Sequence, residues 1–597
     1  MPNPRPIRFF SSLACLLALP LCGQTATQSA AAQINHQAQG QPASGAAATT
    51  LHVEARTVVV DVVATDARDQ PVQDLGIRDF QVLEDGRPQQ IAYFEAHMAA
   101  PAKLEPAEKL PPGIFSNAPV TVPADAVNLL LMDALNTPLR DQVFVRQAME
   151  KYLDTTAPGA SLAMFALDAR LRLVQGFTSD IAALRTAIDS PLAHPQLSPL
   201  LNTAQDNAND QQVIQQIEQA GIQEGSLRAN PLSNAPANPL SSTAVGNVAF
   251  ARQTLQDTNT FKRDERVNMT LEALQQIARY LGGIPGRKNL IWFSGAFPFA
   301  IFPDPTMPGY DNTLLQGANV REYKERLDRT AALLTAAQVA IYPIDPKGAD
   351  GAGKLTEQAT MEELASQTGG EAFYNRNNLG DGVARAVENG SHYYTIAYTP
   401  TNSRVDGTYR NIEVMVEGRK LHLNYRKGYF ATEASPPPGD PLRSLMDPGM
   451  PNFSQVLYKM LVQPTSPQPA ATSPRAGDNA AVQGPVMRET VLFRIEDKDL
   501  DFTPAPDGSR KASLEVAIVA YDANGKPVNW LNRTIEAGLN APAPGAPVQR
   551  AIAFPLQIDL PANAATLRTG VYEAAGSKAG TLELPVAAIA GASMAAR

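Results

Sequence analysis

The fold is decided by a nearly continuous apolar run, Val127-Asn-Leu-Leu-Leu-Met132, that ends at Asp133. A run of this kind is typical of a strand buried on both faces of a parallel sheet. Residues 138–154 follow with the apolar spacing of a helix, and Pro138 suits a first helical turn. The strand and helix together predict the opening unit of an α/β domain.

The same alternation continues along the chain to about residue 390. Further strands are predicted over residues 161–167, 171–174, 289–293, 339–344 and 372–374. Helices are predicted over residues 181–188, 266–281, 322–337, 361–368 and 379–389. Alternating strands and helices favour a doubly wound parallel sheet, and we place this α/β domain over residues 126–390.

Residues 191–250 interrupt this pattern with a composition rich in Asn, Gln, Pro and Ser. Long insertions in compact domains are either disordered or functional. We expect a surface insertion here, with a helix over residues 211–219. Its composition favours disorder, and the alternative is an arm that binds a partner.

Strand patterns flank the α/β domain on both sides. Residues 51–97 and 391–430 are each too short to form a stable sandwich alone. We expect them to pair as one immunoglobulin-like β-sandwich with the α/β domain inserted between them; the alternative is two separate small β units. A second, C-terminal β-sandwich is predicted over residues 489–585, and residues 98–125 and 431–488 are expected to be Pro-rich linkers.

The first 23 residues have the pattern of a signal peptide. Arg5 and Arg8 precede an apolar stretch over residues 9–21, which is shorter than the roughly 20 residues that span a membrane. No other segment reaches that length, so no transmembrane segment is expected after signal removal. Residues 24–50 are predicted to be a disordered spacer. The sequence therefore predicts a secreted or periplasmic protein.

Both cysteines of the chain, Cys15 and Cys22, lie in this leader. The mature chain is therefore expected to carry no disulfide and no thiolate metal site. A lipid anchor on Cys22 is disfavoured because Leu19-Pro20-Leu21 precedes it, where a small residue is normally required.

Charge and motifs exclude several classes of function. The net charge of −9 over 597 residues opposes binding to phosphate backbones, so nucleic acid is not an expected partner. The sequence has no Gly-x-x-x-x-Gly-Lys loop, no Gly-x-Ser-x-Gly elbow and no His-Glu-x-x-His pair. We therefore predict no enzyme, no catalytic residue and no residue that binds an organic cofactor.

Several motifs in a fixed order resemble those of the acidobacterial von Willebrand factor A-related proteins. They are Asp79-Phe-Gln-Val-Leu-Glu-Asp-Gly86, Leu130-Leu-Met-Asp-Ala-Leu-Asn-Thr137, Thr368-Gly-Gly370, Tyr409-Arg-Asn-Ile412, Tyr425-Arg-Lys-Gly-Tyr429, Leu567-Arg-Thr-Gly-Val-Tyr572 and Gly580-Thr-Leu-Glu583. The resemblance runs from about residue 51 to residue 585. It implies export and a von Willebrand A-like fold, and it implies no defined biochemical activity.

The resemblance also implies a place for a metal ion. Von Willebrand A domains bind Mg²⁺ where the first strand ends, through an Asp-x-Ser-x-Ser loop and a Thr and an Asp from later loops. Here Asp133 and Thr137 match that loop and Asn136 adds an amide oxygen, whereas Leu135 stands at the first Ser position. Phe293-Ser-Gly295 stands where Thr-Asp-Gly is expected, so the second acidic ligand is missing.

Two interpretations of this degenerate adhesion site follow. In the first, Asp133, Asn136 and Thr137 hold a hydrated Mg²⁺ or Ca²⁺. The remaining Thr ligand has no clear counterpart, and Thr258 and Thr260 are the candidates. In the second, which the sequence favours, Asp133 caps the following helix.

The function predicted from the sequence is that of an exported, non-catalytic binding or adhesion protein. A protein or an envelope component is expected to bind near Asp133, Asn136, Thr137 and the loop after Ser294, because ligands bind at the carboxyl ends of parallel strands. The alternative is a structural or assembly component of the cell envelope that binds no ligand through a metal. The oligomeric state is left open.

Overall fold

The computed structural model describes most of the chain between residues 57 and 589. The described residues are 57–98, 110–118, 126–155, 161–190, 200, 211–219, 242–284, 286–295, 318–345, 355–374, 379–431, 442–465, 485–504, 509–539 and 551–589. The predicted signal peptide (1–23) and spacer (24–50) lie outside them, as do parts of the predicted linkers and insertion. No helix in the described part of the chain is long and apolar enough to cross a membrane.

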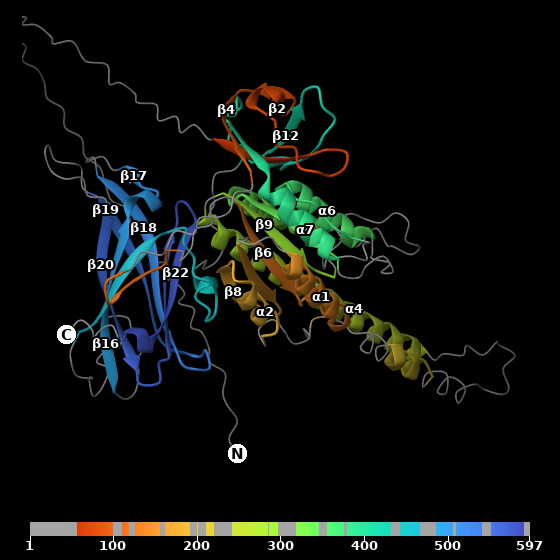
Figure 1. Cartoon of the computed structure of the whole chain (residues 1–597). Coiled ribbons are helices and arrows are strands. Elements are labelled where there is room, and N and C mark those ends of the chain that lie inside the picture. The colour runs from red at the N-terminus through yellow and green to blue at the C-terminus, as the bar shows by residue number, and fades with distance from the viewer. Residues whose placement is uncertain are drawn as a thin grey trace, which may run out of the picture. The chain divides into compact units, whose positions relative to one another are not determined.

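A five-stranded sheet of order β10-β9-β6-β7-β8 forms the centre of the α/β domain (Figure 1). Its strands are β6 (Ala126–Asp133), β7 (Leu162–Leu167), β8 (Leu171–Thr178), β9 (Arg287–Phe293) and β10 (Val339–Ile344). Four strands run parallel, but β8 runs antiparallel to β7, so the expectation of an all-parallel sheet was wrong at this edge. Only three residues join β7 to β8, whereas a parallel crossover needs a dozen or more.

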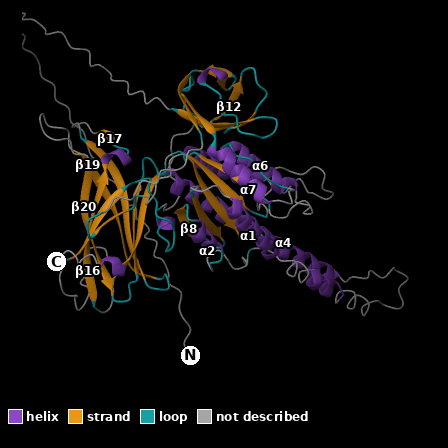
Figure 2. Ribbon diagram, viewed as in Figure 1, coloured by secondary structure: helices purple, strands orange, loops and turns teal. Residues whose placement is uncertain are grey.

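Helices cover both faces of this sheet (Figure 2). One face packs against α1 (Leu139–Thr155), α2 (Ile181–Ile188) and α7 (Leu379–Ser391), and the other against α4 (Ser242–Gly282), α5 (Ala318–Ala336) and α6 (Leu355–Thr368). In β6, Leu130 and Met132 face the first layer, while Leu129 and Leu131 face the second. Burial on both sides is the physical reason for the continuous apolar run.

The helix before β9 is longer than the sequence indicated. We expected it to begin near Arg266, but α4 begins at Ser242 and has 41 residues, a length of about 60 Å at 1.5 Å per residue. Residues 242–250 of the predicted insertion therefore belong to this helix. Residues 211–219 are also helical, and Glu218 pairs with Arg252 of α4 at 2.7 Å. Apart from Leu200, which lies in a turn, the described residues of the insertion are therefore helical.

Two four-stranded sheets form a first β-sandwich from segments on both sides of the α/β domain. One sheet has the order β13-β1-β11-β4 and the other β14-β12-β2-β3. The strands are β1 (Val58–Thr65), β2 (Phe80–Glu84), β3 (Arg87–Gln89), β4 (Ile91–His97), β11 (Tyr393–Tyr398), β12 (Tyr409–Val416), β13 (His422–Asn424) and β14 (Gly428–Phe430). Val60, Val82, Ile396 and Val414 lie in the core between the sheets.

A second β-sandwich contains the C-terminal strands and takes strands from both segments that we expected to be linkers. One sheet has the order β20-β16-β15-β5; the other has the order β17-β18-β21-β22, with β19 also paired to β18. The strands are β5 (Ile114–Ser116), β15 (Tyr458–Pro464), β16 (Val486–Glu496), β17 (Thr503–Pro504), β18 (Arg510–Tyr521), β19 (Pro527–Leu539), β20 (Ala551–Pro561), β21 (Thr566–Glu573) and β22 (Lys578–Pro585). The expectation that residues 98–125 and 431–488 are only linkers was therefore wrong for β5 and β15.

Candidate functional site

The candidate site lies at the carboxyl edge of the central sheet, where β6 ends at Asp133. Strand β6 pairs with β7 on one side and with β9 on the other. The chain runs from β6 to β7 and β8 on one side and then crosses to β9 and β10 on the other side, so the strand order reverses at β6. Such a switch point is where open α/β sheets usually bind ligands. The loop over residues 134–138 joins this strand end to α1.

Asp133 is a buried carboxylate with four hydrogen bonds. Its Oδ1 accepts from the backbone N–H of Asn136 at 3.0 Å. Its Oδ2 accepts from Asn136 Nδ2 at 2.9 Å, from Ser294 Oγ at 2.8 Å and from Trp292 Nε1 at 3.2 Å. Asp133 is 2 % exposed, and burial raises its pKa while these neutral donors oppose the rise.

Asn136 connects Asp133 to α4. Its Nδ2 donates to Asp133 Oδ2 and, at 2.8 Å, to Thr270 Oγ1. Its Oδ1 accepts from the Arg266 guanidinium at 3.4 Å. Asn136 and Thr270 are both buried, so three side chains from β6, the following loop and α4 form one internal network.

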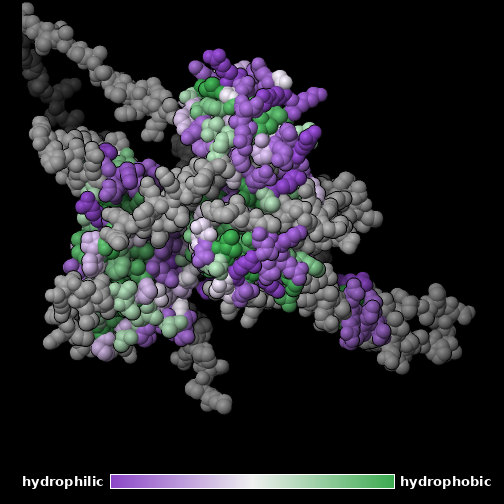
Figure 3. All heavy atoms as spheres, viewed as in Figure 1, coloured by the Kyte–Doolittle hydropathy of each residue, from purple (hydrophilic) through white to green (hydrophobic). Residues whose placement is uncertain are grey.

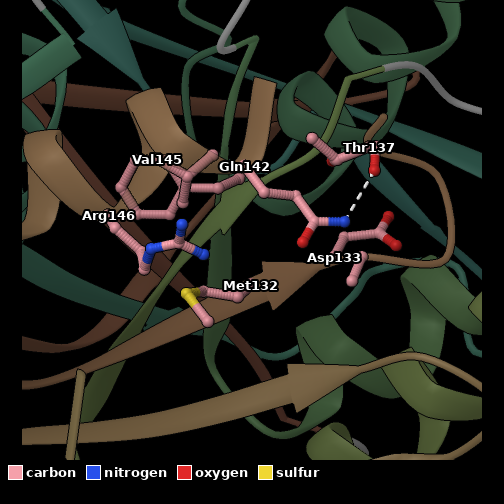
Figure 4. Close-up of a pocket in the computed structure, with 8 residues that line it drawn as sticks. Met132, Asp133, Thr137, Gln142, Val145 and Arg146 are labelled. Carbon is pink, nitrogen blue, oxygen red and sulfur yellow. Dashed lines mark hydrogen bonds between the residues drawn. The ribbon is translucent and has the colours of Figure 1, made fainter. Parts of the chain in front are cut away.

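Thr137 is part of the same loop but bonds elsewhere. Its hydroxyl oxygen accepts from the backbone N–H of Gly295 at 2.9 Å, and its carbonyl accepts from Gln142 Nε2 of α1 at 2.9 Å (Figure 4). A Cβ atom on Gly295 would lie 3.1 Å from the carbonyl oxygen of Asn136. The loops after β6 and β9 therefore pack directly on each other, and a side chain at residue 295 would crowd them.

The prediction that Asp133 caps the following helix was wrong. Its carboxylate bonds to Asn136, Trp292 and Ser294, none of which belongs to α1. In the first turn of α1, the backbone N–H groups of Asp141 and Gln142 donate instead to the carbonyl of Pro138. The physical reason is distance along the chain: α1 begins six residues after Asp133, and the carboxylate closes the intervening loop.

The oxygen atoms of Asp133, Asn136 and Thr137 are not arranged as ligands of a hard divalent cation. The Oδ2 atom of Asp133 already accepts three hydrogen bonds, one more than its two lone pairs, and Oδ1 accepts one. The hydroxyl of Thr137 and the amide oxygen of Asn136 also accept from N–H donors. Mg²⁺ and Ca²⁺ require several oxygen ligands that turn their lone pairs toward the ion. Among the described residues, no group of three or more His, Cys, Asp or Glu side chains is placed to hold a metal ion.

The cleft at this edge is small. It has a volume of about 10 Å³ and is lined by Met132, Asp133, Ala134, Thr137, Gln142, Val145, Arg146 and Phe293 (Figure 4). A volume of this size admits about one water molecule, whereas small-molecule sites usually occupy hundreds of cubic ångströms. The arrangement therefore holds two loops in place and offers no chamber for a substrate.

Three members of the network were not predicted from the sequence, namely Trp292 of β9 and Arg266 and Thr270 of α4. Thr258, one of the two threonines that the sequence suggested, donates its hydroxyl to the carbonyl of Thr254 in its own helix. Thr270 is fully buried between Val267 and Leu271 of the core-facing stripe. A polar residue on that apolar stripe is the signal that could have identified it.

No family model matches this sequence, and no curated protein matches it either. Solved structures similar to it include a von Willebrand factor type A protein from Catenulispora acidiphila, with 11% identity, 58% of this chain and 75% of that chain covered, and a TM-score of 0.22. Another is the three N-terminal domains of the type V pili tip protein Mfa5 from Porphyromonas gingivalis, with 9% identity, 89% and 77% coverage and a TM-score of 0.21. A third is the pilus adhesin SpaC from Lactobacillus rhamnosus GG, with 10% identity, 82% and 57% coverage and a TM-score of 0.22.

Proposed function

We propose that this chain is an exported, non-catalytic binding protein whose von Willebrand A-like domain engages a protein of the cell envelope at the carboxyl edge of its central sheet. In this proposal the two β-sandwiches, the first of them immunoglobulin-like, carry that domain. The motifs that resemble von Willebrand factor A-related proteins and the signal-peptide pattern support export to the periplasm or beyond.

One observation carries the proposal: exposed apolar side chains lie beside a rigidly bonded edge. Leu139, Val143 and Phe144 of α1 are 55 %, 42 % and 52 % exposed, although the opposite side of the helix is buried in the core. The face of the molecule in Figure 3 mixes hydrophilic and hydrophobic side chains. Adjacent exposed apolar groups next to a fixed polar edge are typical of a surface that binds a protein.

The cleft at this edge admits about one water molecule, so the proposal places the partner on the surface beside it. The edge also presents no exposed carboxylate from the network, because Asp133 lies beneath the loop. The partner is therefore expected to contact the apolar side chains of α1 rather than the network itself.

A retention assay tests this proposal. The purified chain is incubated with an envelope fraction of the producing cell that lacks its own copy, and the sedimenting fraction is measured. We expect Val143→Gln with Phe144→Gln to weaken retention by about tenfold or more, because buried aromatic contacts dominate protein interfaces. The control is Trp530→Gln in β19, since Trp530 is similarly exposed at 52 % but lies in the second β-sandwich.

Equal retention of the double variant and the parent, with an unchanged circular dichroism spectrum, would contradict the proposal. Loss of retention in the control alone would move the binding surface to the second β-sandwich. The alternative function, an assembly component that binds nothing through the α/β domain, predicts that both variants behave like the parent.

A further inference from the structure

The side-chain amide of Asn136 lies between two oxygen atoms from different elements. It donates one hydrogen to Asp133 Oδ2 at 2.9 Å and the other to Thr270 Oγ1 at 2.8 Å. A carboxylate at a strand end and a hydroxyl from a later element are the kinds of oxygen that a hard cation would join. In this chain an N–H₂ group joins them instead.

We infer that the amide of Asn136 replaces a divalent cation, so that the site is closed and works without metal. This inference rests on the proposed binding at the same edge and defines its chemistry: no metal ion bridges the partner to Asp133. The amide supplies partial positive charge to a buried carboxylate, as a cation otherwise would.

Arg266 of α4 extends the network on the far side of Asn136. The Nη1 atom of Arg266 donates a hydrogen bond to Asn136 Oδ1 at 3.4 Å. The Asn136 amide therefore accepts from Arg266 through its oxygen and donates to Asp133 through its nitrogen. Hydrogen-bond chains of this kind strengthen each member when they are buried.

Space for a cation is also taken by other donors. The hydroxyl of Ser294 and the indole N–H of Trp292 both donate to the same Oδ2 atom that accepts from Asn136. Mg²⁺ would have to lie 2.0–2.1 Å from that oxygen and to keep an octahedral shell. A cation at Oδ2 would therefore have to displace three donors, whereas Oδ1 accepts a single hydrogen bond, from the backbone N–H of Asn136.

The test compares the parent with Asn136→Asp, which places a second carboxylate beside Asp133. The unfolding temperature of each protein is measured in EDTA and then with Mg²⁺, Ca²⁺ or Mn²⁺. We expect no shift for the parent. We expect Asn136→Asp to unfold at a lower temperature in EDTA and to recover by about 5 °C when a cation binds the folded state.

Asn136→Leu is the matched control, because it removes the amide and adds no charge. We expect it to be destabilised in EDTA and not to recover with a cation. A cation-dependent rise in the unfolding temperature of the parent would overturn the inference, as would an Asn136→Asp variant that no cation stabilises. Neither result alters the retention assay of the α1 variants, so this inference and the proposed function can fail separately.

Discussion

At the scale of single residues, burial decides what each carboxylate does. Asp133 is buried with four donors, and Glu84 of β2 is buried with the hydroxyl groups of Tyr398 and Tyr429 at 2.8 and 2.9 Å. Glu489 of β16 is buried differently, because its Oε2 atom has no hydrogen-bond partner among the described residues. Burial raises the pKa of Glu489 to about 7.

Glu489 should make stability depend on pH. Its pKa is higher in the folded chain than its ordinary value of 4.5, so the folded state favours the protonated form. The stabilisation of the folded state by protonated Glu489 is complete below pH 4.5, and it is lost as the pH rises through about 7. As the pH rises from 5 to 8, we expect the free energy of unfolding of Glu489→Gln to increase by roughly 1–3 kcal/mol relative to that of the parent.

Urea unfolding of both proteins at several pH values measures this difference. Glu496→Gln is the control, because Glu496 is exposed at the end of the same strand. A difference between Glu489→Gln and the parent that stays constant with pH would show that Glu489 is not a buried acid.

At the scale of elements, strands β21 and β22 hold the segment 442–456. Arg568 is fully buried and donates to the carbonyl groups of Leu445, Met450 and Pro451. Gly580 lies under the carbonyl of Val456, and an added Cβ would lie 2.1 Å from that oxygen. Both residues belong to motifs that the sequence analysis singled out, and their role is to bind this segment to the sandwich.

Gly580→Ala should therefore be destabilising. We expect the free energy of unfolding to fall by about 1–3 kcal/mol, because the backbone at Val456 must move to admit the methyl group. Gly538→Ala in β19 is the matched control, since a Cβ there meets nothing within 4 Å. Thermal unfolding of the two variants checks the prediction, and equal unfolding temperatures would contradict the close packing at Gly580.

Elements differed in how far the sequence could predict them. Strand β6 was predictable because burial on both faces leaves a long apolar run. Strand β5 was not, since three residues among prolines carry no period, and it exists only through its pairing with β15. In the candidate site, the contact of Ser294 with Asp133 follows from adjacent strand ends. The bonds of Asn136 to Thr270 and Arg266 depend on how α4 packs, which no local pattern encodes.

At the scale of the whole molecule, chain segments far apart in sequence complete each sandwich. Val60 of β1 pairs with Ile396 of β11, and Lys459 of β15 pairs with Ser116 of β5. Each N-terminal β segment therefore needs strands that follow the α/β domain. Such long-range pairing is slow to form and is lost when either partner is removed.

A chain that ends at residue 390 should leave residues 57–98 without their partners. The valines of β1 that face the core would be exposed, and we expect this segment to be cleaved rapidly in limited proteolysis followed by mass spectrometry. A chain that ends at residue 431 keeps β11 to β14, and these strands should protect residues 57–98 from proteolysis. Equal protection in both chains would show that residues 57–98 fold independently.

We propose that this molecule binds a partner at the α1 edge without a metal ion. The most direct measurement is envelope retention of the unmodified chain in EDTA and in excess Mg²⁺, beside the Val143→Gln, Phe144→Gln variant. We expect equal retention of the parent in both buffers and loss of retention in the double variant. Retention that disappears in EDTA and returns with Mg²⁺ would contradict it.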